Sequence, residues 1–348
     1  YHDDKLQDTY YTDFGIRTIA FRSDSGFYLN GKHVKILGVC QHHDLGPLGA
    51  AVNTRAMERQ LEILKNMGCN AIRTSHNPPA PELLDLCDRM GFLVMDEAFD
   101  VWYLEKMKYD YHIYFKEWHE RDLSDMVLRD RNHPSIILWS IGNEIPEKNH
   151  TKYGGAAIAK ELDAIIKRYD RTRYTTSAFA GVWRADTTFM TDKVDVIGIN
   201  YTPERYAEER AKHPKGFFIA SETTSSLSSR GVYHFSADSA ILRTTDMQCS
   251  AFDNCATSYD RPWAFATQTT WRAVKETPYV AGLFVWTGFD YLGEPPYPDF
   301  PCISSAFGIV DLCGFPKDVY YFYKSQWTDA PVLHLFPHWN WKQGDLID

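Results

Sequence analysis

Long apolar stretches and net positive charge are both missing from this sequence. No segment approaches the roughly 18 consecutive apolar residues that a membrane-spanning helix requires. Lys and Arg number 37 against 46 Asp and Glu, and the resulting net charge of −9 disfavours nucleic acids and anionic membranes as partners. We therefore expect no membrane span and no nucleic-acid partner.

Cysteine is also sparse and irregularly placed. The seven cysteines form no Cys-x-x-Cys pair, so structural zinc of that kind is not expected. Cys69 and Cys87 stand in contexts typical of small core residues, whereas Cys249 and Cys255 could form a disulfide in an oxidising compartment. The chain opens at Tyr1 without a methionine, so a leader or preceding domains could be absent. The sequence leaves that disulfide and the compartment open.

What the chain does contain is an alternation of strand and helix patterns. Residues 1–34 hold two short strand-like segments, which we interpret as a lead-in or linker. Eight apolar runs follow, and they are near-continuous rather than alternating, which is typical of strands buried on both faces. These runs lie at residues 34–39, 71–74, 92–97, 136–140, 174–177, 194–200, 217–222 and 281–286.

Helical patterns separate most of these runs. They lie at residues 55–67, 81–90, 112–131, 155–169 and 263–274, with capping signals such as Asn53 before the first and Gly91 after the second. This order predicts an α/β fold, specifically a (β/α)8 TIM barrel over residues 35–348. The polar segment 223–261 is too long for a routine loop and is predicted to lie over the mouth of the barrel.

Polar side chains follow most strand ends, and in a barrel these ends converge on one pocket. The fourth strand runs into Gly142-Asn143-Glu144, and the seventh ends in Glu222. The other ends carry Gln41-His42-His43-Asp44, Arg73-Thr74-Ser75-His76, Asp96-Glu97-Ala98-Phe99-Asp100, Asn200-Tyr201 and Trp286-Thr287-Gly288-Phe289-Asp290. Aromatic residues make up 15% of the chain, and although most should be core, some rings suit stacking on a sugar.

Two glutamates on facing strands predict glycoside hydrolysis. This reaction needs two carboxyl groups flanking the scissile bond, about 5–5.5 Å apart in enzymes that retain the anomeric configuration. One group must be protonated and the other ionised. Because strands four and seven face each other across an eight-stranded barrel, we expect Glu144 to be the acid/base and Glu222 the nucleophile.

Neighbouring strand-end residues are expected to support this pair. We expect Tyr201 to donate a hydrogen bond to Glu222, Arg73 to keep Glu222 ionised, and Asn143 to bind the sugar 2-hydroxyl. The predicted substrate-binding residues are Arg73, His76, Asp100, Asn143, Tyr201, Trp286 and Asp290, with Trp286 as a platform beneath the sugar.

Several of these residues have a simpler interpretation. Asn143-Glu144 could cap the next helix, Arg73 could simply pair with Glu97, and Trp286 could belong to the core of the barrel. We interpret Asp96 and Glu97 as a pair supporting the pocket from behind.

Two further groups are ambiguous. The segment His42-His43-Asp44, with His76, lacks the helical histidine spacing of a metal site, so neutral hydrogen-bonding histidines are expected. In the loop at residues 178–188, Trp183 and Asp186 either touch the substrate or pack as ordinary loop residues.

The chain resembles glycoside hydrolase family 2 along nearly its whole length. The matching segments include KILGVCQHHDLGPL (35–48), NAIRTSHNP (70–78), LVMDEAFD (93–100), NHPSIILWSIGNE (132–144), FVWTGFDYLGE (284–294) and SAFGIVDLCGFPK (305–317). The resemblance implies a retaining, exo-acting enzyme with Glu144 as acid/base and Glu222 as nucleophile. It also implies that jelly-roll and immunoglobulin-like β domains precede the barrel in the full-length family members.

Among the family activities, β-galactosidase is the best match, through residues 286–290 and the FDYLGEP segment. The implied substrate is a β-galactoside oligosaccharide or glycan. β-Glucuronidases resemble one another in an Asn-x-Lys element after the eighth strand, where this chain has only Pro316-Lys317. β-Glucuronidase and β-mannosidase therefore rank lower, and an inactive carbohydrate-binding barrel is the alternative from another class.

Cofactors and assembly are less well defined. The best-known galactosidase of the family binds magnesium and sodium near the acid/base, but its magnesium ligands are not clearly matched here. We therefore expect no cofactor and no bound metal, with a divalent or sodium ion as the alternative. A homo-oligomer stays an open alternative.

Overall fold

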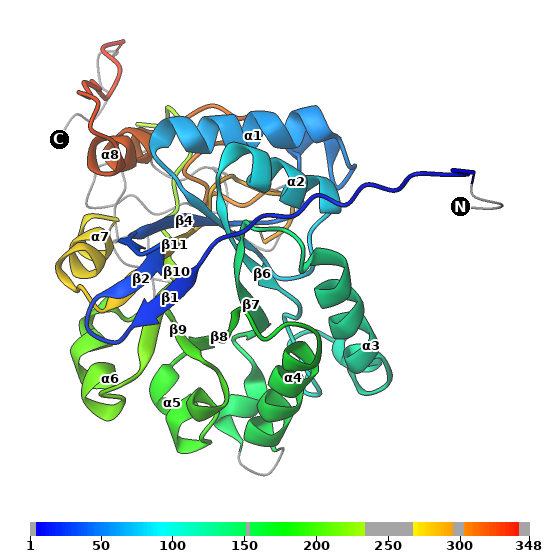
Figure 1. Ribbon diagram of the computed structural model, residues 1–348. Coiled ribbons are helices and arrows are strands. Elements are labelled where there is room, and N and C mark those ends of the chain that lie inside the picture. Colours follow the sequence, from blue (N-terminus) through cyan, green and yellow to red (C-terminus); the bar gives the residue numbers. More distant parts are fainter. Residues whose placement is uncertain (1–4, 151–153, 234–266, 295–302, 341–348) are drawn as a thin grey trace.

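The computed structural model of the chain describes residues 5–150, 154–233, 267–294 and 303–340. Eight parallel strands close into a barrel in the order β10-β11-β4-β5-β6-β7-β8-β9, which confirms the predicted (β/α)8 fold (Figure 1). The barrel strands are β4 (Ile36–Gln41), β5 (Ala71–Thr74), β6 (Leu93–Glu97), β7 (Ile136–Asn143), β8 (Tyr174–Ala180), β9 (Val196–Asn200), β10 (Phe217–Thr224) and β11 (Val280–Trp286).

The described helices surround this barrel (Figure 1). They are α1 (Thr54–Met67), α2 (Pro81–Met90), α3 (His112–Asp130), α4 (Gly155–Tyr169), α5 (Val182–Thr187), α6 (Tyr206–Lys212), α7 (Thr267–Glu276) and α8 (Asp318–Trp327). The predicted caps are present, since the Asn53 side chain accepts from Ala56 N and Gly91 ends α2 at φ 73°.

The lead-in forms a small antiparallel sheet at the amino-terminal end of the barrel. It consists of β1 (Ile19–Arg22), β2 (Gly26–Leu29) and β3 (Lys32–His33). Phe21 lies against Tyr174 and Phe217, which are the first residues of β8 and β10. In Figure 1 β1 and β2 cross in front of the barrel strands. This sheet therefore covers the end opposite the strand termini that carry the predicted site.

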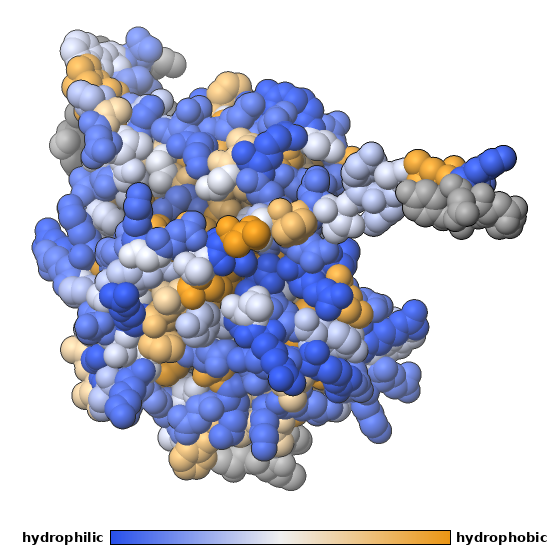
Figure 2. Space-filling view, viewed as in Figure 1, coloured by the Kyte–Doolittle hydropathy of each residue, from blue (hydrophilic) through white to orange (hydrophobic). Residues whose placement is uncertain are grey.

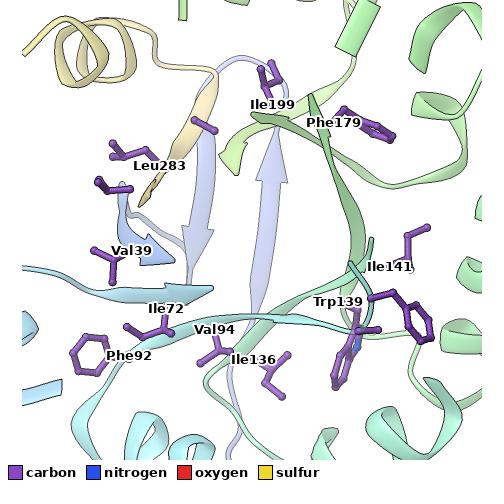
Figure 3. Close-up of a cluster of buried hydrophobic side chains, with 14 of the residues drawn as sticks. Val39, Ile72, Phe92, Val94, Ile136, Trp139, Ile141, Phe179, Ile199 and Leu283 are labelled. Carbon is purple, nitrogen blue, oxygen red and sulfur yellow. The ribbon is translucent and has the colours of Figure 1, made fainter. Parts of the chain in front are cut away.

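The main hydrophobic core lies between the strands and the surrounding helices. Figure 3 shows labelled members of this core, among them Val39, Ile72, Val94 and Leu283, distributed around the ring of strands. A second buried cluster combines inward-facing strand residues with Phe21 and Phe27 of the lead-in. Cys69 and Cys87 are buried free cysteines in the main core, as expected.

Strand ends and short helices differ from the sequence-based expectation. β7 continues through Asn143 and β8 through Ala180, beyond their predicted ends at 140 and 177. The helices α5, α6 and α8 were not expected. Most of the predicted mouth-covering segment 223–261, including the Cys249–Cys255 pair, falls outside the described residues.

The visible surface is predominantly hydrophilic. On the face in Figure 2, apolar residues are scattered, apart from those along the extended amino-terminal segment. None of the helices in the described ranges combines the length and the apolar character that crossing a membrane would require.

Candidate active site

A cavity of about 970 Å³ opens at the carboxyl ends of the barrel strands. Its lining includes residues from the end of every strand or from the loop that follows it. These are His42, His76, Asp100, Asn143, Glu144, Ala180, Tyr201, Glu222 and Trp286. Convergence of strand ends on one pocket is what the barrel topology requires. Of the predicted site residues, all but Arg73 and Asp290 line this cavity.

The two strands that carry the glutamates are irregular just before them. Pairing of β7 with β8 shifts register between Ser140 and Asn143, and pairing of β10 with β9 shifts between Ile219 and Glu222. Such irregularities re-aim the following side chains. They direct the ends of both strands toward the cavity.

Glu144 and Glu222 share one hydrogen-bond donor. Asn200 Nδ2 lies 2.9 Å from Glu144 Oε1 and 3.2 Å from Glu222 Oε2. Two oxygens that accept from one nitrogen at these distances are separated by no more than about 6 Å, so the two carboxyl groups lie next to each other, as a pair flanking one glycosidic bond must. The Asn200 amide is itself oriented by Ser221, whose hydroxyl donates to Asn200 Oδ1 at 2.7 Å.

Tyr201 fixes the second glutamate. Its hydroxyl donates to Glu222 Oε1, and its backbone N–H donates to Glu222 O at 2.7 Å. Burial, followed by the Glu222 and Glu144 carboxylates, raises the pKa of Tyr201, so the hydroxyl remains a protonated donor. Glu144 and Tyr201 both have positive φ, 45° and 59°, an uncommon conformation that typically costs about 1–3 kcal/mol and is often found at functional sites.

Arg73 lies beneath the cavity and is fully buried. It donates to Glu222 Oε2 at 3.0 Å and to Glu97 Oε2 at 2.8 Å. The two interpretations left open by the sequence therefore both hold, because one guanidinium bridges both carboxylates. It also donates to Asn143 Oδ1 at 2.8 Å, which ties it to the amide beside Glu144.

The pKa of Glu222 differs from expectation, because it is raised and not lowered. Burial and then the Glu144 carboxylate raise the pKa of Glu222, and together they outweigh the opposing effects of Arg73 and Tyr201. Arg73 thus favours the ionised form, as expected, but does not bring the pKa of Glu222 below its ordinary value.

Asp96 and Glu97 do not act as a pair. Consecutive strand residues point to opposite faces, so Glu97 reaches the barrel interior whereas Asp96 interacts with Asp130 of α3 on the outside. Burial alone would raise the pKa of Glu97, but Arg73 and His76 hold it at about 2. The interpretation of Asp96 as a support of the pocket was therefore wrong, whereas Glu97 fits it.

Asn143 is held from several sides. Its Nδ2 donates to Asp100 Oδ1 at 3.0 Å and lies 3.3 Å from His76 Nε2. Lys106 bonds the same Asp100 oxygen at 2.7 Å and Asn143 O at 2.9 Å. Asn143 lies within β7 rather than capping a helix, which excludes the simpler interpretation of this residue.

Aromatic rings form one wall of the cavity. Trp286 stacks on His76 with ring centroids 5.2 Å apart and meets His42 edge-on. Trp286 both lines the cavity and belongs to the inner buried cluster, so the platform and core interpretations are compatible. Burial and then His76 lower the pKa of His42 to about 3, which favours a neutral ring. The expected hydrogen bond is missing at His42 Nε2, which has no partner in the described structure.

Arg73 is fully buried beneath the cavity, and three further residues singled out as possible substrate contacts are not brought to it either. The Asp290 carboxylate is bound by Lys317 Nζ at 2.8 Å and by Gly308 N at 2.7 Å, so this predicted substrate contact is occupied by a buried ion pair instead. Trp183 and Asp186 lie on α5 and are absent from the described lining of the cavity.

Other residues at the site had no assigned role from the sequence. Asn200, which bonds both glutamates, lay at a recognised strand end, so its position was a usable signal. Lys106, Tyr291 and Glu294 lie on loops, and no periodic pattern marks a loop residue that folds back over a barrel mouth.

Comparison with known proteins identifies the family. The family model described as "Glycosyl hydrolases family 2, TIM barrel domain" matches residues 20–232. The chain is 46% identical to the β-galactosidase BoGH2A of Bacteroides ovatus, over 99% of this chain and 45% of that protein. It is 30% identical to a β-glucuronidase of Bacteroides fragilis, over 96% of this chain and 47% of that protein.

A solved structure agrees with these sequence matches. The crystal structure of a β-glycosidase from Bacteroides vulgatus superposes with a TM-score of 0.80 at 35% identity, covering 97% of this chain and 45% of that one. The chain thus spans less than half the length of these relatives. From the closed barrel, the convergent strand ends and these matches, we conclude that the chain belongs to glycoside hydrolase family 2.

Proposed function

We propose that this barrel catalyses retaining, exo-acting hydrolysis of terminal β-galactosides, with Glu144 as acid/base and Glu222 as nucleophile. The observation that carries the proposal is the single Asn200 Nδ2 within hydrogen-bonding distance of both carboxylates. A shared donor keeps the two carboxyl groups next to each other, as direct attack on the sugar by one of them requires.

The different surroundings of the two glutamates support the assignment of roles. Glu222 is 5% exposed and is held by Arg73, Tyr201 and Asn200, which fix a carboxylate for attack. Glu144 is more exposed, and Asn200 is the one hydrogen-bond partner recorded for its carboxylate in the described structure. A group that must deliver a proton and then collect another from water needs that access.

The proposed reaction has two displacements. In the first, Glu222 attacks C1 of the sugar while Glu144 gives its proton to the leaving oxygen, so the C1–O bond breaks and a glycosyl ester forms. In the second, Glu144 removes a proton from water, the water oxygen bonds to C1, and the Glu222 ester bond breaks. Two inversions at C1 give net retention.

The charge of the cavity favours a neutral sugar over a glucuronide. Among the residues described in its lining, Lys106 is the single Lys or Arg side chain. Five carboxyl side chains stand against it, namely Asp44, Asp100, Glu144, Glu222 and Glu294. Lys106 is engaged by Asp100 and Asn143, and Lys317 is buried against Asp290. A uronate would therefore meet net negative charge, which opposes its binding. The β-galactosidase relative at 46% identity supports the same choice.

A panel of nitrophenyl β-glycosides tests the sugar and the stereochemistry together. The galactoside should be cleaved with the highest kcat/KM among galactoside, glucuronide, mannoside and glucoside, and NMR should show the β-anomer as first product. Preference for the glucuronide, or an α-anomer first, would contradict the proposal.

Substitution of the two carboxylates tests whether the barrel is catalytic. Glu144→Gln and Glu222→Gln should each lower hydrolysis of the galactoside by at least about 10³-fold. Folding is checked by circular dichroism. If both folded variants retained activity, the assigned mechanism would be wrong.

A further inference from the structure

A second cluster of ligand-type side chains lies outside the cavity, between α5 and α6. Asp186 of α5, Glu209 of α6 and His213, which ends α6, each offer one ligand atom, and these atoms lie within 4.8 Å of one another. None of the three lines the catalytic cavity in the described structure. The cluster thus has no role in the proposed hydrolysis.

Two oxygens of this cluster are buried without a donor. Glu209 is fully buried, yet its Oε2 accepts no hydrogen bond, and neither does Asp186 Oδ2. The other oxygens are engaged, because Glu209 Oε1 accepts from Lys212 at 3.0 Å and Asp186 Oδ1 lies 2.9 Å from His213 Nε2. Buried carboxylate oxygens without partners are costly unless a cation compensates them.

Lys212 supplies one positive charge against the two carboxylates. Its Nζ lies 3.7 Å from Asp186 Oδ2 and 3.1 Å from Glu208 Oε1 as well, so it is shared among three acidic groups. The Lys212 side chain is 37% exposed and has room to turn toward solvent. The position between Asp186 and Glu209 can therefore accept a further cation.

We propose that Asp186, Glu209 and His213 form a binding site for a divalent transition-metal ion of the zinc type. One imidazole nitrogen and two carboxylate oxygens, with water as a fourth ligand, are a set that Zn²⁺ accepts. Calcium and magnesium prefer more oxygen ligands and no imidazole. The bound ion would join α5 to the end of α6.

The experiment uses the whole chain and Zn²⁺ as probe. After loading with zinc chloride and gel filtration in metal-free buffer, the protein should retain about one equivalent by elemental analysis, and titration calorimetry should give the affinity. Glu209→Gln and Asp186→Asn should each weaken binding by more than about 100-fold, beyond the loss typical of groups that only support a ligand. Glu204 is an exposed carboxylate just before α6, so Glu204→Gln is the matched control. This variant should bind zinc as tightly as the parent does.

Lys212→Met provides an independent test that does not remove a ligand. Because the variant removes the competing ammonium, zinc should bind more tightly, by about tenfold or more. Retention of equal zinc by the parent and by the Asp186→Asn/Glu209→Gln double variant would place the ion elsewhere and overturn the proposal. Absence of zinc binding to the parent protein, or an unchanged zinc affinity in Lys212→Met, would also overturn the proposal.

Discussion

Tyr201 and Glu222 are joined twice, by the tyrosine hydroxyl on Glu222 Oε1 and by the tyrosine N–H on the Glu222 carbonyl. The side-chain bond favours the ionised carboxylate and opposes the burial that raises the pKa of Glu222. The two contacts therefore place Glu222 and also influence its protonation.

Removal of this hydroxyl should shift the pH dependence of catalysis. The acid limb of kcat/KM should lie above the ordinary glutamate pKa of 4.5, because the pKa of Glu222 is raised. In Tyr201→Phe the carboxylate loses a stabilising donor, so the limb should move to higher pH and kcat/KM should fall by about tenfold to a hundredfold. A pH–rate profile of both proteins measures this. A limb that stays in place would contradict the assigned role of the hydroxyl.

Asn200→Ala should impair catalysis more than binding. The substitution removes the donor shared by Glu144 and Glu222, and loss of one preorganised donor typically costs about 10²-fold or more in kcat. Asn77→Ala is a suitable control, because Asn77 lines the same cavity but its amide donates to the neighbouring Pro78 carbonyl. Equal kinetics for the two variants would argue against the bridging role.

Azide should distinguish the two glutamates chemically. In Glu144→Ala the nucleophile remains, so an activated aryl galactoside should form the glycosyl ester, and azide should attack it to give the β-galactosyl azide. In Glu222→Ala azide should replace the nucleophile itself and give the α-anomer. NMR of the azide products identifies the anomer that each variant forms. If the anomers were reversed, Glu144 would be the nucleophile and Glu222 the acid/base.

The Arg73–Glu97 pair should make stability depend on acid pH. The folded-state pKa of Glu97 is about 2 against an ordinary 4.5, so its ionised form stabilises the fold above pH 4.5 and this contribution is lost as the pH falls toward 2. The shift corresponds to about 3 kcal/mol. Urea unfolding of Glu97→Gln should show lower stability at neutral pH and a weaker loss between pH 4.5 and 2. Glu62→Gln, in an exposed ion pair with Arg55, should change little.

Asp290 should matter for stability and not for substrate affinity. In Asp290→Asn the buried Lys317 ammonium loses its counter-charge, which typically costs about 3–5 kcal/mol. KM for the galactoside should stay unchanged, whereas Asp100→Asn in the cavity should raise it. The double variant Asp290→Asn/Lys317→Met should recover part of the lost stability. A raised KM without destabilisation would restore Asp290 to the substrate site.

Local sequence was sufficient for the elements with strong periodic or capping signals. The helix Pro81–Met90 was predicted with the observed bounds, because Pro81 and Gly91 mark its two ends. The helices α5 and α6 have six and seven residues, too few for a periodic pattern to emerge. The predicted ends of β7 and β8 each fall three residues short. The added residues, Ile141-Gly142-Asn143 and Ala178-Phe179-Ala180, are mostly apolar, so local polarity does not mark where these strands stop.

The sequence by itself determined the barrel and indicated the two strand ends that carry Glu144 and Glu222. Near-continuous apolar runs can be buried on both faces only in such a layered α/β fold, and strand ends then carry the polar site. Only the tertiary structure decided which neighbours meet. Closure of the barrel brings Asn200 between Glu144 and Glu222 and sets Arg73 between Glu97 and Glu222, whereas Asp290 is captured by Lys317. These contacts join residues far apart in the chain, so they depend on strand register and loop path, which a local pattern does not encode.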